Sequence, residues 1–162
     1  MAAFPILQVL VLLILANGVP VIVKKISGSH MAWPIDAGKQ FRDGQPLFGS
    51  SKTVRGVVSS IVVTTALSPL LGVNVVAGGL VAALAMAGDL FSSFVKRRLK
   101  LAPSTRAIGL DQIPESLFPL LACQRLLSLT FTDIALCVGI FLFGELIVSR
   151  LLYRLRVRDE PY

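Results

Sequence analysis

The segment GDLFSSFVKRRLK, residues 88–100, places one carboxylate in an apolar run and then brings four cations within five residues. If the segment is helical, Asp89, Ser93 and Lys96 share one face, because offsets of four and seven residues nearly complete whole turns. Arg97 lies just beside this face, and Asp89 lies ~10 Å deeper than Lys96 along the helix. An ionised carboxylate within a bilayer costs at least ~2.5 kcal/mol, so it normally faces water or a partner group.

One hypothesis makes Asp89 a metal ligand at the floor of a cleft that opens to the cytoplasm. A second carboxylate, Asp111 in IGLDQIPE, falls on the same side of the membrane, at the start of the next apolar segment. Two carboxylates suit Mg²⁺, a hard cation that takes oxygen ligands and usually keeps a substrate phosphate in its shell. Asp111 alone is weak evidence, because an acid in a first helical turn often serves only as a cap or dipole partner. The residues expected to line the entrance to the cleft are Ser93, Lys96 and Arg97.

A loop rich in glycine and hydroxyl groups, DGQPLFGSSKTVRG at residues 43–56, precedes another apolar segment. Small residues, hydroxyls and cations in one turn are suited to binding phosphate groups. The segment lacks the Gly-x4-Gly-Lys-Ser/Thr spacing of a Walker P-loop. The alternative interpretation is an ordinary basic flank of a membrane helix. The residues expected to contact phosphate are Ser50, Ser51, Lys52, Thr53 and Arg55.

The composition is that of an integral membrane protein. The chain has 162 residues, which suits one domain, and 54% of them are hydrophobic while 15% are charged. Soluble domains have about a quarter of their residues charged. The mean hydropathy is +0.77. A net charge of +7 does not indicate nucleic-acid binding here, because the cations cluster between apolar runs and only 7% of residues are aromatic.

Five apolar segments are candidates to cross a bilayer core, which takes ~20 residues of helix. Phe4–Val23 has 20 residues without a charge and no basic segment before it, so we interpret it as a retained span rather than a signal peptide. Residues 57–95 hold 39 residues with Asp89 as their single charge, enough for two helices with a turn at 68–74. The expected spans of this all-α polytopic protein are 4–23, 57–71, 74–95, 113–129 and 134–152, the fourth being the weakest.

The cations predict the orientation of these spans. With five spans, residues 24–56, residues 96–112 and the C-terminal tail fall on one side of the membrane and hold 15 of the 16 Lys and Arg residues. Only Arg125 falls on the other side. The positive-inside rule therefore places the two basic loops and the C-terminus in the cytoplasm, with the N-terminus outside. Four or six spans would break this asymmetry.

Other polar or reactive residues carry little functional signal. Cys123 and Cys137 lie in apolar sequence and are interpreted as small buried side chains. His30 has no evident second metal ligand near it. The GSHM sequence at residues 28–31 looks like a cloning scar, but it is internal with no tag before it, and we take it as native.

Three segments in this order resemble the CTP-dependent lipid-phosphate cytidylyltransferases. The likeness is strongest to the short CDP-archaeol synthase branch, a relative of CDP-diacylglycerol synthase (phosphatidate cytidylyltransferase). The segments are FRDGQPLFGSSKTVRG, GDLFSSFVKRRLKLAPS and GLDQIP, which cover about residues 33–115. The resemblance implies that Asp89 and Asp111 bind the metal and act in catalysis with Lys96 and Arg97. The substrate-binding residues that it implies are Lys52, Thr53, Arg55, Ser93 and Arg98.

The chain departs from the family pattern in two places. The diacylglycerol branch has Lys-Asp and Pro-Gly-His-Gly-Gly between the two aspartates, where this chain has LAPSTRAIG. The family also commonly has a second acid three residues after the Leu-Asp aspartate. That position is Pro114 here, and Glu115 follows it. These departures leave the composition of the metal shell and the lipid specificity open.

The resemblance implies nucleotidyl transfer (EC 2.7.7 class) from CTP to a lipid monophosphate of the archaetidic-acid or phosphatidic-acid type. A phosphate monoester is already an anionic nucleophile, so the barrier is mainly charge repulsion and alignment, which Mg²⁺ and cationic side chains address. CTP is cytosolic and the lipid phosphate lies at headgroup level, so we expect a plasma-membrane protein with a cytoplasm-facing site. The sequence leaves the lipid tails open, and a homodimer is plausible.

The alternative is a non-enzymatic membrane protein, a small carrier or assembly partner in which Asp89 is structural or conducts ions. Arg125 is the cation that Asp89 would pair with. Asp89 is expected near the cytoplasmic end of its helix, on the same side as Asp111. Arg125 lies ~21 Å of helical rise beyond Asp111 along the next helix. The Asp89 and Arg125 side chains cannot span this distance, so we expect no such pair. The alternative explains the spans and the charge asymmetry. It does not explain why Lys52, Asp89 and Asp111 are all expected at one membrane face.

Overall fold

The computed structural model describes residues 3–102, 105 and 107–154, and the fold of these residues is helical. Apart from two isolated β-bridges, Pro34 with Thr53 and Gln40 with Pro46, the described residues form no strand. The helices are α1 (Ala3–Ser27), α2 (Val54–Leu67), the 3₁₀ helix η1 (Ser68–Leu71), α3 (Val75–Arg98), α4 (Gln112–Ala122) and α5 (Phe131–Arg154). Arg106, Arg156 and Arg158, which contribute to the basic loops and tail, lie outside the described residues.

Four helical segments of the described chain are long and apolar enough to cross a membrane. They are Phe4–Ser27, Val54–Leu71, Val75–Arg98 and Phe131–Leu151. Their outer surfaces carry many exposed large apolar side chains, including Ile14, Val62, Val76, Ile140 and Phe143. Such surfaces suit a lipid environment and not water. The multi-pass, all-helical class expected from the sequence is confirmed.

The fourth expected span is not a single long helix in the structure. Residues 113–129 were expected to be one helix, but α4 has 11 residues and ends at Ala122. It rises only ~16 Å, about half of a bilayer core. Turns follow from Cys123, and Ser128 takes a left-handed conformation with φ of 52°. The polar Gln124 and Arg125 fall in these turns, so a short helix followed by irregular structure stands in place of the expected span.

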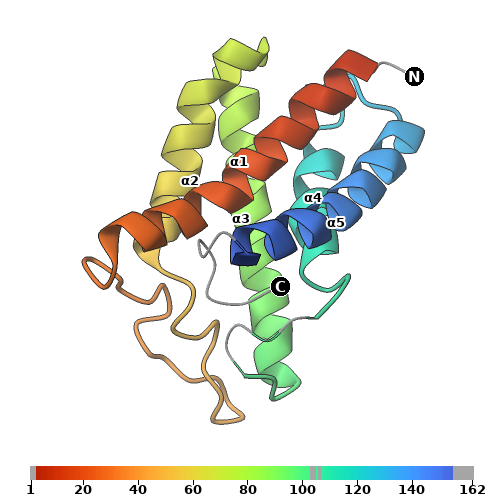
Figure 1. Ribbon diagram of the computed structural model, residues 1–162. Coiled ribbons are helices and arrows are strands. Elements are labelled where there is room, and N and C mark those ends of the chain that lie inside the picture. Colours follow the sequence, from red (N-terminus) through yellow and green to blue (C-terminus); the bar gives the residue numbers. More distant parts are fainter. Residues whose placement is uncertain (1–2, 103–104, 106, 155–162) are drawn as a thin grey trace.

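The connections gather at two ends of the helical assembly (Figure 1). Residues 28–53 and the described residues among 99–111 lie at one end, which we call the loop end, and residues 68–74 and 123–130 lie at the other. α1 crosses in front of α2 and α3 in this view and packs on both, while α4 packs mainly on α3. This arrangement brings the loop before α2, the last turns of α3 and the start of α4 to the same end.

The helix boundaries follow from local capping. Thr53 precedes α2, and its hydroxyl accepts the N–H of Gly56 at 3.2 Å. Asn74 caps α3 in the same way, through Val76 at 2.7 Å. Such caps satisfy N–H groups that have no partner within the helix. Thr53 thereby fixes the point at which the chain changes from the loop into α2, directly after Lys52.

An apolar core holds α1, α3, α4 and α5 together. Leu12 and Leu13 of α1, Val81 of α3 and Leu120 of α4 are fully buried within it. Cys137 of α5 is also buried there, and the thiol of Cys123 is free and buried. The interpretation of both cysteines as small core side chains is confirmed.

Candidate active site

The Lys52 ammonium and the Asp89 carboxylate form an ion pair between the loop and α3. Lys52 Nζ donates hydrogen bonds to both carboxylate oxygens of Asp89, at 2.5 Å to Oδ2. Both side chains are largely buried, with 23% and 21% of their surface exposed. Burial disfavours the charged form of Lys52, but the charges of Asp89 and Glu115 outweigh burial and raise its pKa. The partner of Asp89 is thus Lys52, while Arg125 is exposed in the turns after α4.

Glu115 of α4 lies beside Asp89 and is a site residue that sequence reasoning missed. Its side chain is buried, with 6% exposed, and it interacts directly with the Asp89 carboxyl group. The available signal was spacing: Glu115 follows Asp111 by four residues, so it lies one helical turn farther along the same face. In the sequence, Glu115 stands out only as the neighbour of Pro114, which occupies the position where the family commonly has an acid.

A second ion pair joins α3 to the start of α4. Lys96 Nζ and Asp111 Oδ1 are 2.7 Å apart. Asp111 Oδ2 also accepts the backbone N–H of Ala107 at 3.1 Å, and Lys96 donates to the Thr105 carbonyl at 3.2 Å. The charge of Asp111 acts on Lys52, and the charge of Lys96 acts on Asp89. The two ion pairs and Glu115 therefore form one electrostatic group, the carboxylate–lysine cluster of Lys52, Asp89, Lys96, Asp111 and Glu115.

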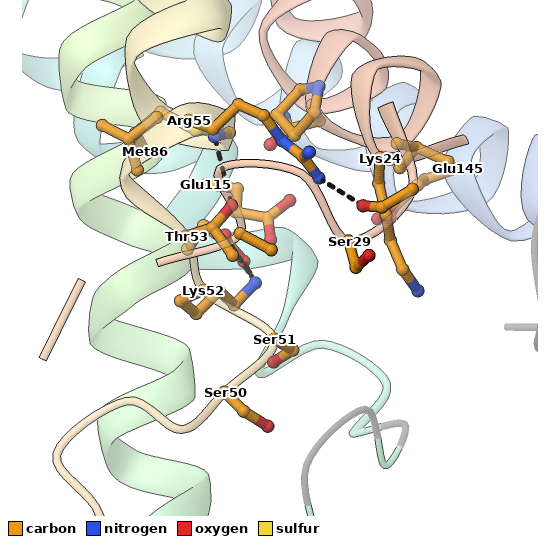
Figure 2. Close-up of a pocket in the computed structure, with 18 residues that line it drawn as sticks. Lys24, Ser29, Ser50, Ser51, Lys52, Thr53, Arg55, Met86, Glu115 and Glu145 are labelled. Atoms are coloured by element: carbon orange, nitrogen blue, oxygen red, sulfur yellow. Dashed lines mark hydrogen bonds and ion pairs between the residues drawn. The ribbon is translucent and has the colours of Figure 1, made fainter. Parts of the chain in front are cut away.

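Part of this cluster lines a cavity of about 490 Å³ at the loop end. Figure 2 shows Lys52, Thr53 and Glu115 on one side of the cavity and Lys24 and Glu145 on the other. Ser50 and Ser51 line the cavity from the loop. The cavity combines cationic, carboxylate and hydroxyl groups with apolar walls from α1, α2 and α3. Of the site residues expected from the sequence, the lining includes Lys52, Thr53, Arg55 and Asp89.

Five other expected site residues lie outside this lining, and all of them except Ser93 contact the loops. Ser93 is buried in α3, and Arg97 is buried and donates to the Ala102 carbonyl at 2.8 Å. Arg98 donates to the Pro46 carbonyl at 2.6 Å and pairs with Asp43 at 3.1 Å. The other two are Lys96 and Asp111, the ion pair described above. Arg55 does line the cavity, but its guanidinium also donates to the Gly28 and His30 carbonyls and so fastens the end of α1 to α2.

Mg²⁺ is the metal that the family resemblance implies, and the cavity offers suitable donors. Asp89 and Glu115 supply adjacent carboxylates in its lining. Among the residues that the structure describes, no three acidic, histidine or cysteine side chains converge into a metal-binding group. Mg²⁺ is commonly held by one or two carboxylates together with substrate phosphates. The donor set therefore fits a metal ion that is completed by a nucleotide, whereas Asp111, the second ligand expected from the sequence, is paired with Lys96.

Known proteins resemble this chain over most of its length. A protein from Sulfurisphaera tokodaii described as a CDP-archaeol synthase is 34% identical over 135 residues, covering 80% of this chain and 81% of that protein. One of the same description from Hyperthermus butylicus is 32% identical over 160 residues, covering 91% and 89%. A solved structure described as "Structural insight into an intramembrane enzyme for archaeal membrane lipids biosynthesis" aligns with a TM-score of 0.70 and 28% identity, covering 86% of this chain and 91% of that chain.

The family evidence favours an enzyme over a carrier or assembly protein. The model of the family described as CarS-like, CDP-archaeol synthase, matches residues 4–162. The match includes all the residues of the carboxylate–lysine cluster and every helix of the fold. The chain therefore belongs to the CDP-archaeol synthase family and is a membrane-embedded cytidylyltransferase.

Proposed function

We propose that this protein transfers CMP from CTP to an archaeal lipid monophosphate, forming a CDP-lipid and pyrophosphate. A phosphate oxygen of the lipid attacks the α-phosphorus of CTP. The bond between the α-phosphorus and the oxygen that bridges the α- and β-phosphates breaks. Pyrophosphate leaves with the electron pair of that bond. The observation that carries the proposal is the Asp89–Glu115 carboxylate pair beside Lys52, in a cavity that reaches the loop end.

Each part of the cluster has a proposed role in this reaction. Lys52 releases Asp89 when substrate arrives and binds phosphate oxygens, where its charge offsets the repulsion between two anionic reactants. Asp89 and Glu115 would hold Mg²⁺, whose charge would stabilise negative charge on the phosphates. Asp111 is proposed to position Lys96 rather than to bind the metal. The metal ligands proposed from the sequence, Asp89 and Asp111, are therefore revised to Asp89 and Glu115.

The hydroxyl-rich loop is proposed to bind the triphosphate of CTP. Ser50 and Ser51 are exposed in the loop and line the same cavity as Lys52, and Thr53 follows at the N-terminus of α2. Arg55 adds a cation to the cavity, and Lys24 of α1 adds another. Nucleotide and lipid phosphates both carry negative charge, so a cavity with cations on two sides suits their simultaneous binding.

We propose that the protein lies in the cell membrane, with its loop end facing the cytoplasm and its N-terminus outside. α4 and the turns after it then make the fourth of five passages between the two faces. The support is the position of the cations next to the loops, which the positive-inside rule assigns to the cytoplasm. Lys24 lies in the last turn of α1, Lys52 lies in the loop before α2, and the last turn of α3 holds Lys96, Arg97 and Arg98. A homodimer is part of the proposal, since two copies would cover apolar helix faces. Measuring the mass of the detergent-solubilised protein by light scattering tests it.

The experiment that tests the function uses the purified protein with CTP, Mg²⁺ and either an isoprenoid-ether or a fatty-acyl lipid phosphate. We expect stoichiometric formation of CDP-lipid and pyrophosphate with the ether lipid, and loss of both products when Mg²⁺ is chelated. Parallel reactions with ATP, GTP and UTP report the base preference. Absence of CDP-lipid with both lipids would overturn the proposal, and faster reaction of the acyl lipid would overturn only the ether assignment.

A further inference from the structure

Asp36 is a buried carboxylate in the loop before α2, and its oxygens are used by the backbone of that loop. Only 5% of its surface is exposed. Oδ2 accepts the N–H groups of Phe48 at 3.0 Å and Gly49 at 2.9 Å, and Oδ1 accepts the N–H of Gly38 at 3.0 Å. The Asp36 side chain thus joins the early part of the loop to Phe48 and Gly49, which lie 12 and 13 residues farther along the chain. A buried carboxylate without such donors would cost several kcal/mol, so these bonds are what makes its burial possible.

The segment that Asp36 holds is the turn at residues 49–52, which ends in the catalytic-site lysine. The Lys52 N–H donates to the Gly49 carbonyl at 3.2 Å, which closes the turn. Gly49 has φ of 92°, a conformation that favours glycine. Asp36 therefore fixes the first residue of the turn through the Gly49 N–H. The neighbouring residue Ile35 fixes the last, because its N–H donates to the Lys52 carbonyl at 2.8 Å.

A second anchor acts on the loop from α3. Arg98 donates to the Pro46 carbonyl, and its guanidinium lies over the rings of Phe41 and Phe94, at 4.7 and 4.8 Å from their centroids. The two rings also meet edge to face at 5.4 Å. Arg98 thus attaches the middle of the loop to α3, while Asp36 shapes the part that enters the cavity. Contacts within the protein therefore hold the loop both at its middle and at the start of the turn.

We propose that Asp36 is a positioning residue that preforms the 49–52 turn as the binding site for the CTP triphosphate. The inference rests on the proposed function, since it assigns the turn to nucleotide phosphates. Asp36 does not line the cavity, so it acts through the residues it holds: Ser50 and Ser51 at the turn and Lys52 at its end. Without the carboxylate, the turn must be ordered when CTP binds, and that ordering weakens CTP binding.

The test compares Asp36→Ala and Asp36→Asn with Asp133→Asn. Asp133 is a matched control because it is also a buried carboxylate that accepts a backbone N–H, from Thr130 at 3.0 Å, at the far end of the fold. We expect the KM for CTP to rise on the order of tenfold or more in Asp36→Ala. The rise should be smaller in Asp36→Asn, whose single side-chain oxygen keeps part of the bonding. The KM for the lipid phosphate should stay near the wild-type value, and kcat should fall less than KM rises.

A double-mutant cycle separates positioning from general damage. CTP binding is measured directly by calorimetry for Lys52→Met, Asp36→Ala and the double variant. If Asp36 acts through the turn, the double variant binds CTP more tightly than the product of the two single effects predicts. Multiplying effects would mean that Asp36 acts independently of Lys52, and they would overturn the inference. So would equal KM values for CTP in Asp36→Ala and Asp133→Asn.

The remaining outcomes also decide the matter. If both Asp36 variants fail to fold while Asp133→Asn folds, Asp36 is a residue of general stability and the positioning role is wrong. If wild-type protein forms no CDP-lipid, the proposed function fails whatever the Asp36 variants do. If wild-type protein is active and Asp36→Ala keeps its affinity for CTP, only this inference fails.

Discussion

Gly88 of α3 and Pro114 of α4 approach so closely that a Cβ atom on Gly88 would overlap the Pro114 carbonyl group and the Glu115 nitrogen. The residues that follow them, Asp89 and Glu115, are thereby placed side by side in the cavity lining. A glycine at this point is what lets two helices bring two carboxylates together. The approach of the backbones is thus part of the construction of the proposed metal site.

Gly88→Ala is expected to separate α3 from α4 and to lower both stability and activity. The overlapping atoms are backbone atoms, which cannot move aside as a side chain can, so the cost is on the order of 1–3 kcal/mol. Gly139→Ala is the matched control, since a Cβ there meets no atom within 4 Å. Melting temperature and CTP turnover of the two variants are compared. A Gly88→Ala protein with wild-type values for both would contradict the close-approach argument.

Asp89→Asn and Glu115→Gln are each expected to abolish turnover while the protein stays folded. Loss of a metal ligand removes transition-state stabilisation worth three or more decades in rate. Asp111→Asn should have a smaller effect, because Asp111 is paired with Lys96 and acts on the cavity only through it. Turnover is measured over a range of Mg²⁺ concentrations. Full activity of Glu115→Gln together with an inactive Asp111→Asn would restore the metal pair expected from the sequence.

Much of the fold was open to prediction, because apolar length and charge are properties of continuous segments. The turn at residues 68–74 was expected from residue type alone. The pairing at the site was not, since the sequence leaves open which of several cations meets which acid. Lys52 reaches Asp89 because Asp36 holds the loop in a folded-back conformation through its hydrogen bond from the Gly49 N–H. No rule of sequence spacing predicts these contacts. Glu115 was missed because the family pattern drew attention to Pro114, the position before it.

The length of α4 shows a different limit. Hydropathy predicted a span over residues 113–129 because Leu120, Leu121 and other apolar residues dominate its average. The helix ends instead where Gln124 and Arg125 interrupt the apolar sequence. Averaged hydropathy indicates where a chain is buried, while the end of a helix depends on local polar residues and backbone conformation.

The contribution of Asp36 to stability is expected to depend on pH in the acidic range only. Burial opposes its ionisation, but hydrogen bonds from the Phe48, Gly49 and Gly38 N–H groups outweigh burial and lower its pKa below the usual 3.8. A carboxyl group with a lowered pKa stabilises the fold fully above its pKa in the unfolded chain. This contribution is lost as pH falls through the lower pKa of the folded state.

The measurement for Asp36 is the difference in melting temperature between wild type and Asp36→Asn as a function of pH. The difference should be constant from neutral pH down to about pH 5 and shrink below about pH 4. Asp133→Asn, measured in parallel, shows how much of the acid effect comes from another buried carboxylate. A difference that vanishes between pH 8 and pH 6 would contradict the assignment, because an ionised Asp36 does not titrate there.

Arg125→Gln is expected to lower thermal stability only slightly and to keep metal-dependent CTP turnover. Arg125 is exposed in the turns after α4, at the end of the fold opposite the site, whereas Asp89 is paired with Lys52. Removing an exposed cation that is remote from the cluster leaves no buried charge unpaired, so its effect should stay within about 0.5 kcal/mol. Lys52→Gln is the informative contrast, because it leaves the buried Asp89 without its cation and should cost ~3 kcal/mol or more. Melting temperatures and turnover of the two variants are measured side by side. Equal losses of stability in both, with recovery of the Arg125→Gln protein by a second change of Asp89→Asn, would make Arg125 the true partner and remove the basis for the Lys52–Asp89 site.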